Sequence, residues 1–99
     1  MASQSYWVYI LLCENNTYYT GYTPDLEKRY QAHLDGSSQC KYTRAFKPLR
    51  IAQFWEIIGD KSLAMRLEYY IKKLSRIEKE KIIQYPERLD ISLLNEARK

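Results

Sequence analysis

The chain has 99 residues, a formal net charge of +4 at pH 7 and a pI near 9.1. Its 45% hydrophobic residues suffice for one compact core, and no apolar run approaches the roughly 20 residues of a membrane span, so we expect a single domain that does not cross a membrane. The two cysteines lack CxxC spacing and the N-terminus lacks a secretory signal, which favours a reducing cytoplasm over a disulfide-rich secreted protein.

The first 23 residues have the pattern of a β-hairpin. Residues 6–13 (YWVYILLC) are a continuous apolar run of strand length, and residues 17–23 form a second strand rich in tyrosine. Asn15 and Asn16 lie between the two strands, and asparagine tolerates the left-handed conformations of tight turns. The pattern therefore predicts two antiparallel strands.

The register of this hairpin is left open by the stretch YYTGYT, residues 18–23. A two-residue loop would pair Tyr9 with Tyr22 and place Tyr19 on the opposite face of the sheet. A three-residue loop, or a bulge near Gly21, would place Tyr9 and Tyr19 on the same face. Glycine inside a strand marks either such a bulge or a close approach of another group.

A helix is expected next, with Thr23 as its candidate N-cap, Pro24 at its first position and Gly36 at its end. Residues 37–48 read as a basic loop that can contain a helical turn. Residues 49–58 (LRIAQFWEII) read as a third strand.

Two further helices are predicted in the second half of the chain. Asp60 or Ser62 can cap the first of them, whose expected buried stripe is Leu63, Leu67, Tyr70, Ile71 and Leu74. The stretch 75–78 (SRIE) is a capping box that begins a new helix, which should end before Pro86. We therefore expect one α/β (α+β) domain over residues 1–85 and a C-terminal tail over residues 86–99.

Basic residues gather in two segments, 25–50 and 61–81, where they outnumber the carboxylates. Such a distribution suits a polyanion-binding face and equally suits a solvated helix surface. Charge alone does not separate the two.

Five residues from separate elements have chemistry beyond packing: Tyr9, Tyr19, Arg29, His33 and Glu68. Each also has an ordinary explanation, as a half-buried strand aromatic, a boundary histidine or a carboxylate paired with a nearby cation. The arginine and the histidine are four residues apart, so they share one face of a helix.

The order and spacing of these residues resemble the GIY-YIG nuclease superfamily. The first motif stands as Trp7-Val8-Tyr9 and the second as Tyr19-Thr20-Gly21, followed by Arg29 with His33, by Lys41-Tyr42-Thr43-Arg44, and by Glu68 on a late helix. The similarity runs from about residue 6 to about residue 83 and is greatest to small stand-alone bacterial members.

The resemblance implies the GIY-YIG endonuclease fold, a three-stranded antiparallel sheet flanked by helices, and hydrolysis of phosphodiester bonds with one Mg²⁺ or Mn²⁺ ion. It implies that Tyr9 is the general base, that Arg29 binds phosphate and that Glu68 holds the metal, while Tyr19 and His33 complete the site. Because a free tyrosine has a pKa of about 10, Tyr9 is expected to need Arg29 and the metal to lower it.

The resemblance also implies that the partner is nucleic acid, with DNA expected and a role in DNA repair or recombination. The residues expected to contact it are Lys41, Tyr42, Arg44, Lys72, Lys73 and Arg76. Contacts of this kind are salt-sensitive and indifferent to sequence, so an accessory protein that supplies specificity is a candidate partner. The oligomeric state stays open.

Two alternatives remain at this stage. One is a nucleic-acid-binding module that keeps the scaffold but cleaves weakly or not at all, and whose binding is unaffected by loss of Glu68. The other is a protein-interaction domain that uses exposed tyrosines and the C-terminal tail.

Overall fold

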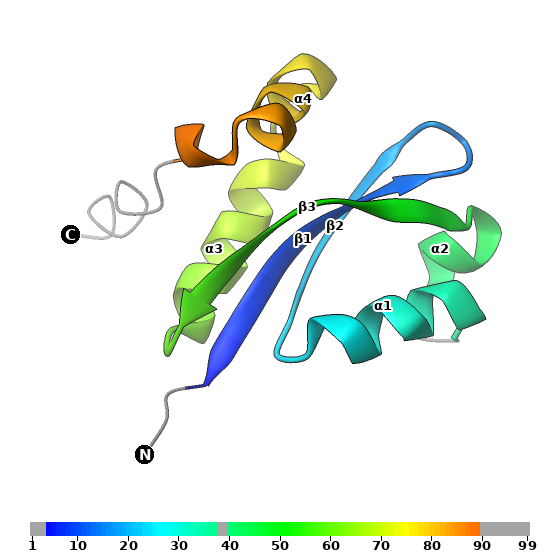
Figure 1. The fold of residues 1–99 in the computed structure, drawn as a ribbon, viewed down its shortest axis with the longest axis horizontal. Coiled ribbons are helices and arrows are strands. Elements are labelled where there is room, and N and C mark those ends of the chain that lie inside the picture. Colours follow the sequence, from blue (N-terminus) through cyan, green and yellow to red (C-terminus); the bar gives the residue numbers. More distant parts are fainter. Residues whose placement is uncertain (1–3, 38–39, 90–99) are drawn as a thin grey trace.

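The structure, a computed structural model, describes residues 4–37 and 40–89. Three strands form one antiparallel sheet, and helices cover both of its faces (Figure 1). The strands are β1 (Ser5–Cys13), β2 (Tyr18–Thr23) and β3 (Pro48–Ile58), and β1 lies between the other two. The predicted sheet and its flanking helices are confirmed.

A three-residue loop sets the register of the hairpin. The Cys13 amide donates to the Thr17 carbonyl at 2.9 Å, and Asn16 has a φ of 61°, the left-handed conformation that such loops require. As a result Tyr9 pairs with Gly21, and Tyr19 lies two pairs further along, on the same face as Tyr9. The two-residue-loop alternative is therefore wrong.

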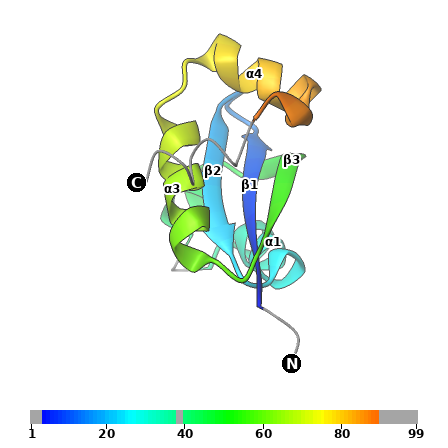
Figure 2. The ribbon, with the colours of Figure 1, turned by 90° about the vertical axis from the view of Figure 1, so that its left-hand side faces the viewer.

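One face of the sheet forms the apolar core. Val8 and Ile10 of β1 pack there against residues of α3 (Lys61–Lys72) and α4 (Arg76–Gln84). Figure 2 shows the sheet and the two helices from the side. Leu67 of α3 is fully buried in the same cluster. Tyr70, expected in the buried stripe, is 43% exposed, because the buried stripe of α3 is Ala64, Leu67 and Ile71 and Tyr70 lies beside it.

The opposite face is covered by α1 (Leu26–Asp35), which is followed by the short helix α2 (Lys41–Ala45). Tyr9, Leu11 and Cys13 of β1 form a second buried cluster on this face, beside Leu26 and Tyr30 of α1. The helical turn expected within residues 37–48 is thus confirmed as α2.

Helix ends follow local capping chemistry, with one correction. α1 is capped by Asp25, whose carboxylate accepts a hydrogen bond from the Lys28 amide at 3.1 Å. The prediction of Thr23 as the cap is wrong, because its hydroxyl bonds to the backbone of Asp25 instead. Gly36, with a φ of 70°, ends α1 as expected.

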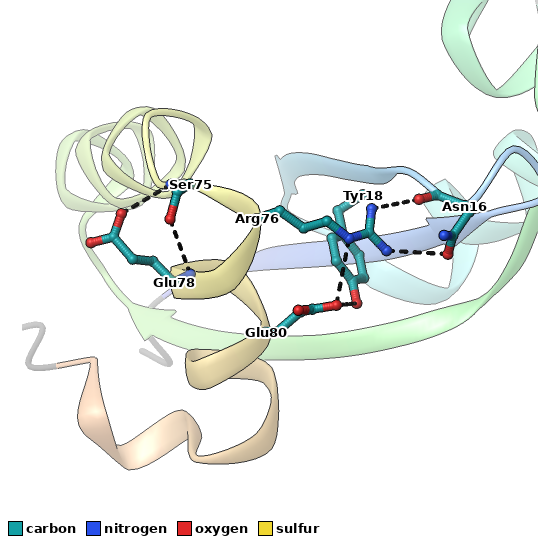
Figure 3. Close-up of polar contacts among 6 residues, drawn as sticks. All are labelled: Asn16, Tyr18, Ser75, Arg76, Glu78 and Glu80. Carbon is teal, nitrogen blue, oxygen red and sulfur yellow. Dashed lines mark hydrogen bonds and ion pairs between the residues drawn. The ribbon is translucent and has the colours of Figure 1, made fainter.

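Asp60 caps α3, and its carboxylate accepts from the Leu63 amide at 2.9 Å. Ser75 and Glu78 form the predicted capping box at the start of α4, which ends before Pro86 (Figure 3).

The last described residues pack on the core rather than away from it. A 3₁₀ turn, η1 (Pro86–Arg88), places the Pro86 carbonyl 3.2 Å from the indole nitrogen of Trp55, and Leu89 is buried in the apolar cluster. Residues 90–99 lie outside the described part of the chain, so the boundary expected at residue 85 stays a prediction. Among the described residues, no helix is long and apolar enough to cross a membrane.

Candidate active site

Four of the five residues singled out in the sequence line a single pocket of about 570 Å³: Tyr9, Tyr19, Arg29 and Glu68. They come from β1, β2, α1 and α3. Because residues from both faces of the sheet line it, the pocket follows the exposed edge of β2, and Gly21 lies in its wall.

The Tyr9 ring lies against the backbone of β2 at Gly21. A Cβ atom at this position would lie 2.6 Å from the phenol oxygen and 2.8 Å from the ring carbon that carries it. Such distances are far below a van der Waals contact, so only glycine lets the phenol occupy its place. The glycine in the tyrosine-rich strand is thus required by a close approach, one of the two roles expected for it.

His33 lies behind Tyr9 and is fully buried. Its Nε2 is 2.8 Å from the Tyr9 hydroxyl, and its Nδ1 is 2.7 Å from the Thr43 hydroxyl. The Thr43 hydroxyl donates to the Cys40 carbonyl at 3.3 Å, so it accepts from Nδ1–H of the histidine. Nε2 is then the acceptor, and Tyr9 donates its proton to it.

Electrostatics keep both members of this pair neutral at pH 7. Burial raises the pKa of the Tyr9 phenol above its usual value, and the Arg29 guanidinium, which hydrogen-bonds to it, offsets only part of that rise. Arg29 alone therefore does not bring the Tyr9 pKa below its usual value, and the lowering expected from Arg29 together with a metal stays a prediction. Burial, together with the Arg29 charge, lowers the pKa of His33 to about 4.

Tyr19 lies between the surface and the buried, hydrogen-bonded residues Tyr9, His33 and Thr43. Its ring meets the His33 ring edge-on at 5.2 Å and stacks on the Tyr42 ring at 5.6 Å with an interplanar angle of 22°. Burial raises the pKa of its phenol as well, and the nearby Arg29 charge opposes this. Tyr9 and Tyr19 therefore present two neutral phenols beside one guanidinium.

Among the described residues, Glu68 is the one carboxylate that lines the pocket, and its side chain is 20% exposed. It forms an ion pair with Lys72 at 3.6 Å, one of the pairings expected from the sequence. Within residues 4–37 and 40–89, no group of three or more His, Cys, Asp or Glu side chains is placed to hold a metal. The donor set still fits Mg²⁺, which is commonly held by one or two carboxylates and completes its shell with water and substrate phosphate.

The six residues expected to contact nucleic acid lie in two regions. Lys41, Tyr42 and Arg44 are exposed on α2 next to Tyr19. On the other side of the molecule, Lys72 pairs with Glu68 and the Lys73 ammonium lies 4.3 Å from the centre of the Tyr69 ring.

Arg76, the sixth residue, holds the hairpin to α4 (Figure 3). Its guanidinium covers the Tyr18 ring at 4.7 Å, donates to the carbonyl and side chain of Asn16 and pairs with Glu80 at 3.5 Å. These intramolecular contacts involve all three nitrogens of the guanidinium. Its assignment as a nucleic-acid contact stays a prediction.

Three residues near the site were not predicted to act there. Thr43 orients the His33 ring, Lys61 lines the pocket, and Phe46 extends the aromatic contacts of Tyr42 at 5.4 Å. Thr43 belongs to the Lys41-Tyr42-Thr43-Arg44 motif, but its hydrogen bond to His33, ten residues earlier, depends on how the intervening segment folds. Lys61 shares a helix face with Glu68, seven residues away, and that spacing was a signal for it.

This fold is that of a known class of catalytic domain. The chain belongs to the GIY-YIG catalytic domain family, whose pattern matches residues 5–81. Membership indicates a nuclease-type function with a nucleic acid as substrate.

Bacterial relatives cover most of the chain. A UPF0213 protein of Bacillus licheniformis is 43% identical over 84 residues, which cover 85% of this chain and 84% of that protein. Another, of Clostridium perfringens, is 46% identical over 77 residues, 78% of this chain and 81% of that protein. The solution NMR structure of a UPF0213 protein from Bacillus halodurans shares 41% identity with a TM-score of 0.53, covering 82% of this chain and 84% of that one.

Proposed function

We propose that the protein is a metal-dependent endonuclease that hydrolyses phosphodiester bonds in DNA. The observation that carries this proposal is the convergence of Tyr9, Tyr19, Arg29 and Glu68 on one open pocket, with His33 hydrogen-bonded behind Tyr9. These side chains supply a proton acceptor, a phosphate-binding cation and a carboxylate within the same cavity, as hydrolysis of a phosphodiester requires.

Arg29 has the chemistry to bind and orient the scissile phosphate. Its planar guanidinium can contact two phosphate oxygens at once, which a lysine ammonium cannot do. It lines the pocket while it also hydrogen-bonds to the Tyr9 phenol, so a bound phosphate lies close to the proposed base. Binding and base activation are thereby coupled through one side chain.

Tyr9 and His33 would act as a pair in proton transfer. As a water molecule attacks phosphorus, its proton passes to the Tyr9 oxygen, and the phenol proton passes to Nε2 of His33 along the existing 2.8 Å hydrogen bond. Burial is the main cause of the low His33 pKa, and the Arg29 charge adds to it. A phosphate on Arg29 offsets that second contribution, so substrate binding makes the histidine a better acceptor. No free phenolate has to accumulate in the resting protein.

Glu68 is the residue that would hold one divalent ion, Mg²⁺ or Mn²⁺. Such an ion supplies Lewis-acid stabilisation of the charge that develops on the phosphate. To accept an ion, the carboxylate must exchange its ion pair with Lys72, and because that lysine side chain is 52% exposed it can leave without being buried unpaired.

The test is cleavage by wild type and by Glu68→Ala on duplex, single-stranded, flap and branched DNA with Mg²⁺ or Mn²⁺ at low salt. We expect metal-dependent cutting that is lost in Glu68→Ala while DNA binding is retained. Glu27→Ala is the matched control, since that glutamate is exposed on α1 and does not line the pocket.

Equal binding without cutting by either protein would replace the endonuclease with a nucleic-acid-binding module on the same scaffold. The high pKa of the Tyr9 phenol is the observation that favours this second candidate. Cleavage selective for flaps or branched junctions would support a place in DNA repair or recombination.

A further inference from the structure

A row of aromatic rings leads from the proposed active site to the surface. Tyr19, which lines the pocket, stacks on Tyr42, and Tyr42 contacts Phe46 at 5.4 Å between ring centres. The outer two rings are 37% and 39% exposed. The row is therefore continuous from inside the pocket to solvent.

The outer part of this row is held in place by the hairpin turn. The Tyr42 hydroxyl is hydrogen-bonded to the Thr17 hydroxyl and accepts from the Asn15 amide at 3.3 Å. The amide of the next loop residue after Phe46, Lys47, donates to the Glu14 carboxylate at 3.1 Å. Because its aromatic surface is already ordered, a ligand that stacks on it loses little entropy on binding.

Three cations are close in sequence to the exposed rings. Lys41, Arg44 and Lys47 are all exposed on or next to α2. Within the described residues none of them forms an ion pair, since the two pairs present involve α3 and α4. Exposed rings among unpaired cations complement a ligand that combines flat aromatic faces with negative charge.

We propose that Tyr42 and Phe46 form a stacking platform for unpaired nucleotides of a DNA strand whose scissile phosphate lies in the pocket, so that the preferred substrate is single-stranded or carries a single-stranded segment. This inference rests on the proposed function and adds its substrate class. Stacking on aromatic side chains with cations along the backbone is how proteins bind single strands without reading sequence.

Base pairing prevents this mode of binding. In a duplex, the flat faces of the bases are covered by neighbouring base pairs, so a protein ring reaches them only after a base leaves the stack. Lys41, Arg44 and Lys47 would attract a duplex and a single strand alike through their phosphates. Phe46, which has no polar atom, contributes only where a base face is free.

The experiment measures binding in EDTA, where no cleavage occurs, by fluorescence anisotropy of a labelled oligothymidine and of a blunt duplex, each of roughly a dozen nucleotides per strand. We expect Phe46→Ala to weaken oligothymidine binding by about tenfold and duplex binding by less than about twofold. Phe46→Trp should retain the affinity for the single strand, because it retains a ring.

Phe54→Ala is the matched control. Phe54 is 47% exposed and lies on the same face of the sheet as Tyr9. Its ring contacts Trp7 and lies apart from α2. It should leave both affinities unchanged, and circular dichroism should show that all variants remain folded. Oligouridine binding provides a third arm.

Equal loss for the duplex and the single strand, an equal loss in Phe54→Ala, or no loss in Phe46→Ala would each overturn the platform. Dependence on Phe46 that is confined to oligouridine would overturn the assignment to DNA. None of these results depends on Glu68 or on cutting, so the platform can fail while the endonuclease stands, and the reverse.

Discussion

The two faces of β1 differ in what they require of the sequence. Val8 and Ile10 point into an apolar cluster with α3 and α4, where side chains need the right volume and no polar partner. Tyr9 points to the opposite face, where hydrogen bonds link Tyr9 to His33, His33 to Thr43, and Thr43 to the Cys40 carbonyl. One face is constrained by volume, the other by the positions of individual atoms.

This difference means that stability and activity should separate by face. Burial of hydrocarbon stabilises the fold wherever it occurs. The hydrogen bonds among Tyr9, His33 and Thr43 mainly offset the cost of removing these polar groups from water, so their net contribution to stability is small. Substitutions on the apolar face should therefore change the free energy of unfolding with little change in cleavage per folded molecule. Substitutions on the polar face should lower cleavage more than they lower stability.

The largest effect is expected for Ile10→Ala. This side chain is fully buried, so its loss should lower the free energy of unfolding by about 2–5 kcal/mol, measured by urea denaturation. Cleavage per folded molecule should stay close to the wild-type level, because Ile10 itself does not line the pocket.

Ile58→Ala removes the same atoms from an exposed position, where the side chain is 68% exposed, and should change the unfolding free energy by less than about 0.5 kcal/mol. If Ile10→Ala lowered cleavage as strongly as it lowered stability, the separation of the two faces would be refuted.

A smaller effect is expected for Gly21→Ala, which adds one methyl group on the polar face. The new Cβ would meet the Tyr9 hydroxyl at 2.6 Å, so the ring must move, at about 1–3 kcal/mol of stability and with loss of its hydrogen bond to His33. Cleavage should fall further than stability does, as kinetics on the folded fraction would show.

Tyr9→Ala provides the control for this clash. In that background the space is vacant, and Gly21→Ala should then be close to neutral in unfolding free energy, which gives a large coupling in a double-mutant cycle. The same loss in both backgrounds would mean that the strand, and not the phenol, requires glycine.

The sequence predicted the apolar face better than the polar face, for a physical reason. Helix periodicity placed Leu67 and Ile71 correctly in the core, because burial depends on pattern. The register that unites Tyr9 with Tyr19 depended on the conformation of one residue, Asn16, which spacing alone left open.

Side-chain contacts within the site were beyond the pattern for a similar reason. The role of Thr43 arises from a hydrogen bond to a residue in another helix, and no local signal indicates it. The cap at Asp25 was missed because Thr23 and Pro24 are also a good start signal, and the two differ only in which side chain reaches a free amide. Residue types were predictable, and their partners were not.

The smallest expected effect is on the pH dependence of the unfolding free energy. Because burial and Arg29 lower the pKa of His33 from the usual 6.5 to about 4, the unfolded chain binds more protons between these values, and stability should fall as the pH is lowered from about 6.5 towards 4. His33 is the single histidine of the chain, so His33→Gln removes this titration entirely.

Carboxylates titrate near the lower end in both proteins, so the informative quantity is the difference between the stability curves of wild type and His33→Gln. That difference should narrow or change sign on acidification, whereas Ile10→Val should shift the whole curve without changing its slope, since the Ile10 side chain has no titratable group. Parallel curves for wild type and His33→Gln would mean that the histidine is not held neutral, and the proton path from Tyr9 would then lack its acceptor.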